Sequence, residues 1–301
     1  MDTRDITFHQ TTFSKIYNEI YKETPQNFID VFLCGGASSK KTKSVRDKLR
    51  ILLEEDNNIR VLYPEDLFIE MLNHDKNYDL LSLERFLADN SDIICIVCES
   101  PGSLVELGAF TNNDNTVDKV IALIEKKRKK QKSFIMLGPV KILRKINEER
   151  VIFYEDDLKV VSSQLLKAFR NTKRHQLNSA ATSSYKPINT LIGLHHFIPL
   201  ILYFFTKIES KKLSASLKRL FEENDFSVKD FETMFRPTLK LLYKDKIIYK
   251  NKVGNNSEYL LTEIGYQKVI EVLEETNIKD RNKLYDSIRF SIINDKYYRS
   301  S

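Results

Sequence analysis

The sequence predicts an α/β protein: a domain built on a parallel sheet with helices on both faces, followed by a mainly α domain. In the first half of the chain, short apolar runs alternate with helical patterns, which is typical of parallel sheets. A polar stretch follows, and beyond it three helical patterns precede a strand–turn–strand pattern. A chain of 301 residues has room for both domains.

The expected strands are short and apolar, and each ends at a turn. They are residues 28–34, 59–63, 92–98, 119–124 and 151–154. Helical spacing covers residues 1–28, 45–53, 66–72 and 78–89, and a further helix is expected from Leu104. Ligands of such sheets bind at the C-terminal ends of the strands. The loops after Cys34, Tyr63 and Cys98 are therefore the candidate binding loops.

We expect the sheet domain to span residues 1–170 and the second domain residues 191–301. Residues 171–190 are polar and poor in large apolar side chains, so they are predicted to be a linker. In the second domain the expected helices are 197–208, 214–223 and 227–243, and the expected strands are 246–250 and 258–261. Three helices followed by such a hairpin indicate a winged helix, a variant of the helix-turn-helix.

The composition favours a soluble cytoplasmic protein. Hydrophobic residues make up 42% of the chain and charged residues 30%. The N-terminus has no signal-peptide core, and the longest apolar stretch, Phe197–Phe205, is about half a membrane span. No membrane segment is expected. The formal net charge of +6 permits a nucleic-acid partner without requiring one.

The cysteines and histidines indicate neither a disulfide framework nor a metal centre. There are three cysteines, and Cys95 and Cys98 lie on one apolar strand, where residues three apart point to opposite faces. They are interpreted as core residues. His195 and His196 have no partner at ligand spacing, so we treat them as structural.

The segment Glu99–Phe110 carries the strongest candidate for chemistry, Glu106. One interpretation is structural: Ser103 and Glu106 form a capping box, and Gly108 allows close helix packing. The other is catalytic. A carboxylate beside the end of a strand could attack or stabilise C1′ of a ribose as the base departs, as in retaining glycoside hydrolysis. Local pattern alone leaves both open.

Residues Gly35–Thr42 nearly spell a phosphate-binding P-loop, but Lys40 stands where the second glycine is required. An ATPase is therefore not expected. Gly35 and Gly36 remain well placed to touch a ribose or phosphate, and Phe32 or Tyr63 could stack on a base.

The Glu-Leu-Gly helix after strand and loop resembles nucleoside deoxyribosyltransferases, a Rossmann-like family in which this glutamate is the nucleophile. The resemblance implies that Glu106 is the nucleophile. It also implies that Glu84, eight residues before Asp92 at the start of the strand, contacts the leaving base. The family's aspartate six residues before the nucleophile is Ser100 here, so strict deoxyribonucleoside specificity is not expected.

A closer resemblance, to the effectors of bacterial retron anti-phage systems, covers most of the chain. It rests on five segments in order: Phe32–Gly36, Tyr63–Phe68, Leu80–Glu84, Glu99–Asn113, and Ser133–Ile135 with Gly138–Val140. It implies a ribosyltransferase-like domain fused to a winged helix. It further implies a toxic effector held inactive by a reverse transcriptase and its RNA–DNA hybrid (msDNA). The implied activity is N-glycosidic cleavage, with NAD as leading substrate and no cofactor.

Position assigns further residues to the site. Those expected to contact substrate are Cys34, Gly35, Gly36, Tyr63, Ser100, Gly102, Ser103 and Asn113. Those expected to contact nucleic-acid phosphates are Lys127, Arg128 and Lys129 in a basic loop, and Arg236 and Lys240 on the third helix of the second domain. Since related transferases often complete their sites across subunits, a homo-oligomer is also expected.

Three functions compete. The first is an N-glycosidase toxin that uses Glu106, and it is favoured because Glu106 and Glu84 are both present. The second is a non-catalytic regulator that binds DNA. The third is a metabolic deoxyribosyltransferase, which Ser100 and the fused second domain disfavour.

Overall fold

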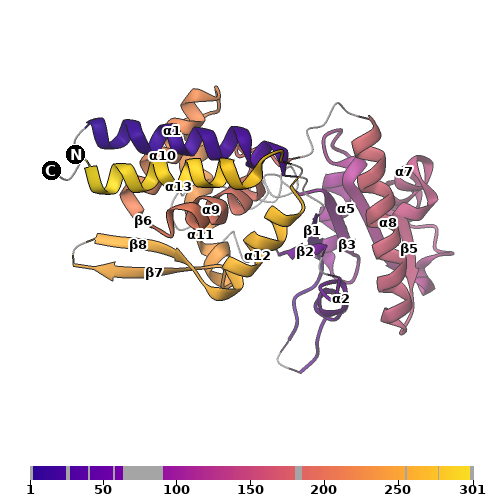
Figure 1. Ribbon diagram of the computed structural model, residues 1–301. Helices are drawn as coiled ribbons and strands as arrows, with labels where there is room; N and C mark the ends of the chain where they lie inside the picture. The colour runs from indigo at the N-terminus through magenta and orange to yellow at the C-terminus, as the bar shows by residue number, and fades with distance from the viewer. Residues whose placement is uncertain are drawn as a thin grey trace. The chain divides into compact units, whose positions relative to one another are not determined.

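The computed structural model describes residues 3–24, 28–39, 41–56, 58–63, 91–179, 185–254, 256–276 and 278–298. The chain forms two compact units (Figure 1). One is residues 27–182, and the other joins residues 1–26 to residues 183–301. We expected the first 26 residues to belong to the sheet domain, but they group with the second unit. The reason is apolar packing within the second unit, where Phe13 contacts Phe205 and Tyr17 contacts Phe197.

The first unit contains a five-stranded, wholly parallel sheet, which confirms the predicted fold class. Its strands are β1 (Ile29–Cys34), β2 (Ile59–Leu62), β3 (Ile93–Val97), β4 (Val120–Glu125) and β5 (Val151–Tyr154). Their order is β2-β1-β3-β4-β5. The strand order reverses between β1 and β3, and such a switch point opens a crevice at the carboxyl ends of the two strands.

Helices cover both faces of this sheet. α2 (Val45–Leu53) and α8 (Leu158–Ser179) contact each other and share one core with β1 residues Val31 and Leu33. On the other face, α5 (Pro101–Thr111) sets Phe110 against Phe32 of β1. The other helical segments among the described residues of this unit are α6 (Phe134–Leu137), α7 (Pro139–Ile146) and the 3-10 turns Val117–Lys119, Lys126–Arg128 and Glu148–Arg150.

α8 runs through residues 171–179, where the sequence predicted the start of a linker. Its polar side chains bind the amino edge of the sheet instead of facing only solvent. Lys173 Nζ lies 2.5 Å from Asp92 Oδ1, and Gln176 donates to the Asp92 carbonyl at 3.2 Å. Asp30, fully buried beside them, accepts from Arg60 Nε at 2.9 Å. A buried carboxylate needs such a partner, so this edge is held by ion pairs.

The second unit starts with α1 (Thr3–Glu19) and the 3-10 turn Tyr21–Glu23. After residue 185 come α9 (Leu191–Phe205), β6 (Lys207–Glu209), α10 (Ser210–Glu223) and α11 (Val228–Lys244). They are followed by β7 (Ile248–Val253), β8 (Asn256–Leu261), α12 (Glu263–Glu274) and α13 (Arg281–Tyr298). The three strands form an antiparallel sheet in the order β6-β8-β7.

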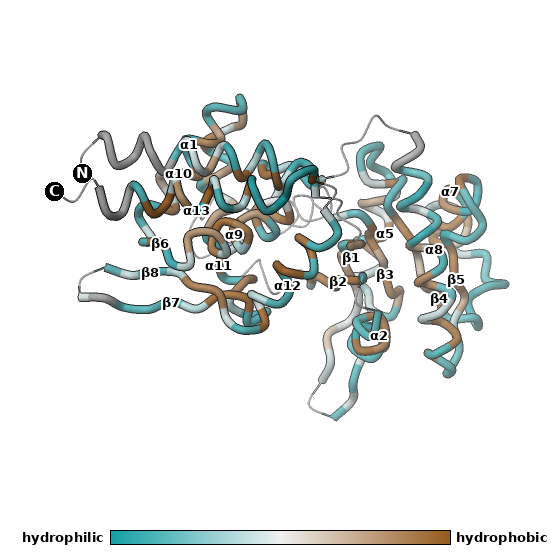
Figure 2. Tube along the Cα trace, viewed as in Figure 1, coloured by the Kyte–Doolittle hydropathy of each residue, from teal (hydrophilic) through white to brown (hydrophobic). Residues whose placement is uncertain are grey.

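The three expected helices and the hairpin are present in the expected order. α9 begins earlier than predicted because Thr190 caps it, accepting a hydrogen bond from Gly193 N. Figure 2 shows hydrophobic residues gathered in α9 and in the strands of the parallel sheet. None of the helices in the described part of the chain combines the length and hydropathy needed to cross a membrane.

Candidate functional site

The candidate site lies at the carboxyl edge of the parallel sheet. The strand ends there bring together the loop after β1, the residues Cys98–Ser100 after β3, and the loops after β4 and β5. α2 and α5 both begin at this edge, because each follows a strand that ends there. Helix N-termini attract negative charge. An anionic ligand can bind their amides only where no side chain of the protein already does.

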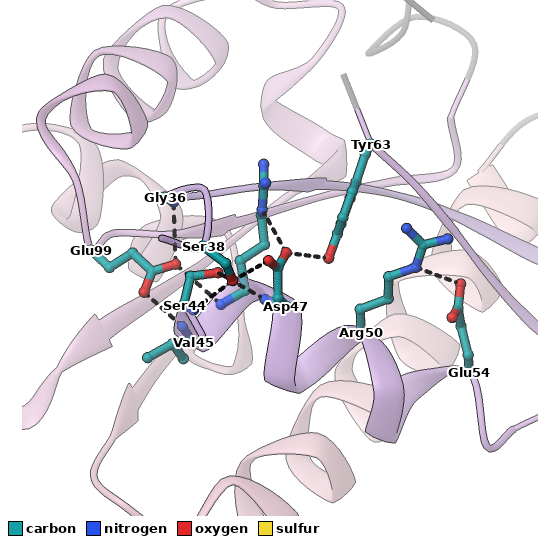
Figure 3. Close-up of polar contacts among 10 residues, drawn as sticks. Gly36, Ser38, Ser44, Val45, Asp47, Arg50, Glu54, Tyr63 and Glu99 are labelled. Carbon is teal, nitrogen blue, oxygen red and sulfur yellow. Dashed lines mark hydrogen bonds and ion pairs between the residues drawn. The ribbon is translucent and has the colours of Figure 1, made fainter. Parts of the chain in front are cut away.

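Glu99 binds the amides that surround the start of α2 (Figure 3). Its Oε1 accepts from Gly36 N at 3.2 Å and from Arg46 N at 3.1 Å, and its Oε2 accepts from Val45 N at 2.8 Å. A Cβ on Gly36 would lie 3.2 Å from Glu99 Cγ, so glycine permits this close approach. One carboxylate thereby joins the end of β3 to the loop after β1.

Tyr63, at the end of β2, is held by α2 (Figure 3). Its hydroxyl donates to Asp47 Oδ1 at 2.8 Å. The guanidinium carbons of Arg46 and Arg50 lie over the ring, 4.4 and 4.5 Å from its centroid. Burial and then Asp47 raise the pKa of Tyr63, so the phenol stays protonated and donates. A base that stacked on Tyr63, as predicted, would compete with these two cations for the face of the ring.

The start of α5 differs from the prediction. The helix begins at Pro101, and the capping box joins Ser100 to Ser103, with Ser100 Oγ accepting from Ser103 N at 3.2 Å. The structural interpretation of this segment, a capping box between Ser103 and Glu106, is therefore wrong. Proline is well suited to the first helical position. Because Pro101 takes that position, the cap is Ser100, three residues before Ser103. Gly108 is not packed closely either, since a Cβ there would meet no described atom within 4 Å.

Glu106 consequently lies in the second turn of α5 and is not the helix cap. Its side chain is half-buried, and its Oε2 is shielded from solvent. The pKa of the buried Cys98 thiol is raised to about 12. Burial is the main cause, the negative charge of Glu106 adds to it, and Arg128 opposes it. Cys98 is thus a neutral thiol at physiological pH. Glu106 places a carboxyl group beside this thiol.

Tyr154, at the end of β5, belongs to the same edge. Burial raises its pKa to about 12, with further contributions from Glu125, Glu99 and Cys98, while Arg128 lowers it. The charge of Arg128 thus acts on both Cys98 and Tyr154 at this edge, and that of Glu106 acts on Cys98. Glu99, Arg46, Asp47 and Tyr154 were missed by the sequence analysis. For Glu99 the usable signal was its position directly after the most apolar strand.

The structure brings most of the predicted substrate residues to this edge. Cys34 is buried at the end of β1, and Gly35, Gly36, Tyr63, Ser100, Gly102 and Ser103 lie in the adjoining loops and helix starts. Ser103 is buried, and its hydroxyl donates to the Ser100 carbonyl at 2.8 Å. Asn113 does not join them, because it follows the opposite end of α5. Glu84 lies outside the described residues.

The predicted nucleic-acid residues fall into two places. Lys127, Arg128 and Lys129 follow β4 at the carboxyl edge, and Lys127 Nζ lies 2.8 Å from Glu125 Oε2. Arg236 and Lys240 are exposed on α11, whereas Phe231 and Leu239 of that helix are buried. The apolar and basic residues of α11 thus occupy different faces.

No metal centre is evident in the described part of the chain, where no three His, Cys, Asp or Glu side chains gather at ligand distance. Cys95 and Cys98 are buried and form no disulfide, as predicted for core cysteines, and Cys34, which was predicted to contact substrate, is buried as well. His195 is also buried, with Nε2 3.1 Å from Asp245 Oδ2.

The strand order defines an open parallel α/β domain whose candidate site lies at the switch point, and this domain is joined to a helical unit. The profile of the STM3845 retron effector protein family matches residues 42–250. The chain belongs to this family.

Two curated relatives from Escherichia coli support this assignment. The chain is 29% identical to "Retron Ec86 putative ribosyltransferase/DNA-binding protein" over 281 residues, which covers 91% of this chain and 87% of the relative. It is 32% identical to "Retron Ec73 putative ribosyltransferase/DNA-binding protein" over 123 residues, or 40% of this chain and 39% of the relative.

The three hydrogen bonds of Glu99 predict a specific effect of Glu99→Gln. A glutamine can accept through only one oxygen, and its amide group would face backbone N–H donors. We expect the free energy of unfolding to fall by about 2 kcal/mol, as measured by urea denaturation. Hydrogen exchange should become faster at the amides of Gly36, Val45 and Arg46. The exposed Glu155→Gln is the control, with a change within about 0.5 kcal/mol. Unchanged protection of those three amides would contradict the assigned role.

Proposed function

We propose that this chain is the toxic effector of a retron defence system and breaks the N-glycosidic bond of NAD or a related nucleotide, with Glu106 as nucleophile. The observation that carries the proposal is the position of Glu106. It lies one turn inside α5 beside a neutral thiol, while the capping role that would explain it otherwise belongs to Ser100 and Ser103.

The proposed reaction has two steps. A Glu106 oxygen attacks C1′ of the ribose as the C1′–N bond breaks, and the electron pair of that bond leaves with the base. Water then attacks C1′ of the glycosyl ester, loses a proton and releases the Glu106 carboxylate, with net retention. The nicotinamide of NAD is cationic before cleavage and neutral afterwards, so its departure needs no proton. A neutral nucleoside would need one, and Glu84 is the proposed group that contacts its leaving base.

Ser100 supports a substrate other than a deoxynucleoside. It occupies the position of the aspartate that binds sugar hydroxyls in deoxyribosyltransferases, and its hydroxyl is engaged in the α5 cap. Nothing at this position therefore provides the carboxylate on which the deoxyribosyltransferase site depends. The base-exchange function is disfavoured for this reason.

The second unit is proposed to act as a winged helix that contacts the retron's nucleic acid. Helices α9, α10 and α11 and the β7–β8 hairpin follow the order of that fold. Arg236 and Lys240 lie four residues apart on the exposed face of α11, and Lys250 and Lys252 are exposed on the hairpin. Both curated relatives carry "DNA-binding" in their names. We propose that reverse transcriptase and msDNA hold the enzyme inactive through this unit.

The catalytic proposal predicts that the purified chain, without retron partners, releases nicotinamide from NAD. Glu106→Gln should lower the rate by about a thousandfold or more, because a nucleophile is lost. The control is Glu149→Gln, an exposed glutamate that pairs with Lys167. Chromatography of nicotinamide, and of cellular NAD after expression, gives the readout. If the Gln variant matches the native chain, Glu106 is not the nucleophile and the regulator function is favoured. If only native Glu106 stops growth while NAD stays level, the substrate is another nucleotide.

The nucleic-acid proposal predicts that Arg236→Ala with Lys240→Ala weakens binding to msDNA. Each lost phosphate contact should reduce the slope of log K against log salt by about 1. Fluorescence anisotropy at several salt concentrations measures this slope. Lys283→Ala on α13, outside the helix-turn-helix elements, is the control. An unchanged slope in the double variant would show that α11 contacts protein instead.

A further inference from the structure

A cavity of about 490 Å³ opens at the carboxyl edge beside the ends of β4 and β5. Its volume is in the range of small-molecule sites, about 300–1,000 Å³. Val45 and Lys48 of α2 form one wall, and Leu158 at the start of α8 forms another. Tyr154 and Glu125, the last residues of β5 and β4, also line it. Neither the predicted substrate residues nor the proposed reaction uses this space.

The lining combines the three kinds of group that a nucleoside with a phosphate requires. Val45, Leu158 and the ring of Tyr154 provide apolar surface for a base. The carboxylates of Glu125 and Asp156 can accept hydrogen bonds from ribose hydroxyls. Lys48 is exposed at the rim and forms no ion pair with any residue that the structure describes. A lysine in this setting is a binding group for a phosphate.

Glu125 is an ionised acceptor in this lining. Its pKa is lowered, first by the hydrogen bond from Lys127 and also by Arg128, despite some opposition from burial. Lys127 Nζ lies 2.8 Å from its Oε2. The cavity therefore has a fixed carboxylate that can select a donor such as a ribose diol.

The cavity and Glu106 lie at the same edge but over different strands. Glu106 follows β3, and Tyr154 ends β5, two strands away. Adjacent strands are about 4.8 Å apart, so the ends of β3 and β5 are separated by about 10 Å along the edge. The helices that wall the cavity, α2 and α8, pack on the face of the sheet opposite α5. Arg128 follows β4, the strand between β3 and β5, and its Nε lies 3.5 Å from Glu125 Oε2. A single nucleoside at Glu106 would leave the cavity empty.

The amides that usually hold the phosphates of a dinucleotide are engaged by the protein itself. Those at the start of α2 bind Glu99, and the N-terminal cap of α5 is Ser100. The amides at the start of α2 are therefore closed to phosphates that pass along this edge, which cationic side chains can bind instead. Arg128 and Lys48 are the cations placed along that path.

We propose that this cavity binds the second nucleoside of a dinucleotide substrate, the half remote from the bond cleaved at Glu106. The inference rests on the proposed function and extends it by assigning the substrate class: a two-part molecule with linking phosphates. Arg128 and Lys48 bind the phosphates, and the wall of Val45, Tyr154 and Leu158 receives the base.

The test compares NAD with nicotinamide mononucleotide, which lacks the second nucleoside. Leu158→Trp fills the cavity, and Lys48→Glu reverses the charge at its rim. Both should raise KM for NAD by about tenfold, by removing contacts to the remote half. Leu158→Trp should leave kcat/KM for the mononucleotide unchanged, and Lys48→Glu should lower it less than it lowers kcat/KM for NAD, because the mononucleotide keeps one of the two phosphates. Val160→Trp, on the exposed side of α8, is the control and should change neither. Equal effects on both substrates, or no effect on NAD, would overturn the proposal.

A binding measurement separates this inference from the proposed function. ADP should bind the Glu106→Gln protein in calorimetry, and Leu158→Trp combined with it should abolish that binding. Suppose that the native chain fails to cleave NAD, but ADP binds and Leu158→Trp abolishes that binding. The proposed reaction then fails and the cavity assignment stands. If NAD is cleaved but ADP does not bind, the cavity assignment fails and the reaction stands.

Discussion

The site depends on the carboxylate of Glu99 and the three backbone amides that it binds. A parallel sheet leaves its carboxyl edge open where the strand order reverses, and loops at such an opening need a fixed partner. Glu99 supplies that partner by joining the end of β3 to Gly36 and to the start of α2. Because a carboxylate of the chain already binds these three amides, they are closed to the phosphate of a ligand.

A consequence of this arrangement concerns α5. Its N-terminus is satisfied by Ser100 and Ser103, which leaves Glu106 one turn further along with no capping role. Burial keeps Cys98 protonated beside it. In the proposed reaction, this half-buried carboxylate beside a neutral thiol would stabilise the positive charge that develops on a sugar carbon. Membership of the retron effector family gives this chemistry its biological setting.

Much of this could be predicted from the sequence. The strands near 29–34, 93–97 and 120–125 are apolar enough to specify a buried parallel sheet, and the family follows from the segments around Gly35 and Glu106. The cap of α5 could not be assigned, because Ser100 and Ser103 both satisfy the local pattern and only Pro101 distinguishes them. The helical course of residues 171–179 depends on Asp92, far away in sequence. The packing of residues 1–26 with the second unit depends on tertiary contacts such as Phe13 with Phe205, which periodicity does not reveal.

The central claim is that Glu106 becomes covalently attached to the sugar. A nicotinamide dinucleotide with fluorine at the 2′ carbon tests it most directly, because fluorine there slows hydrolysis of the glycosyl ester. After incubation, the mass of the protein should increase by one ribosyl-containing adduct, located by fragmentation on the peptide that contains Glu106 and absent from Glu106→Gln. Release of nicotinamide with no adduct, or with an adduct on another residue, would contradict the account.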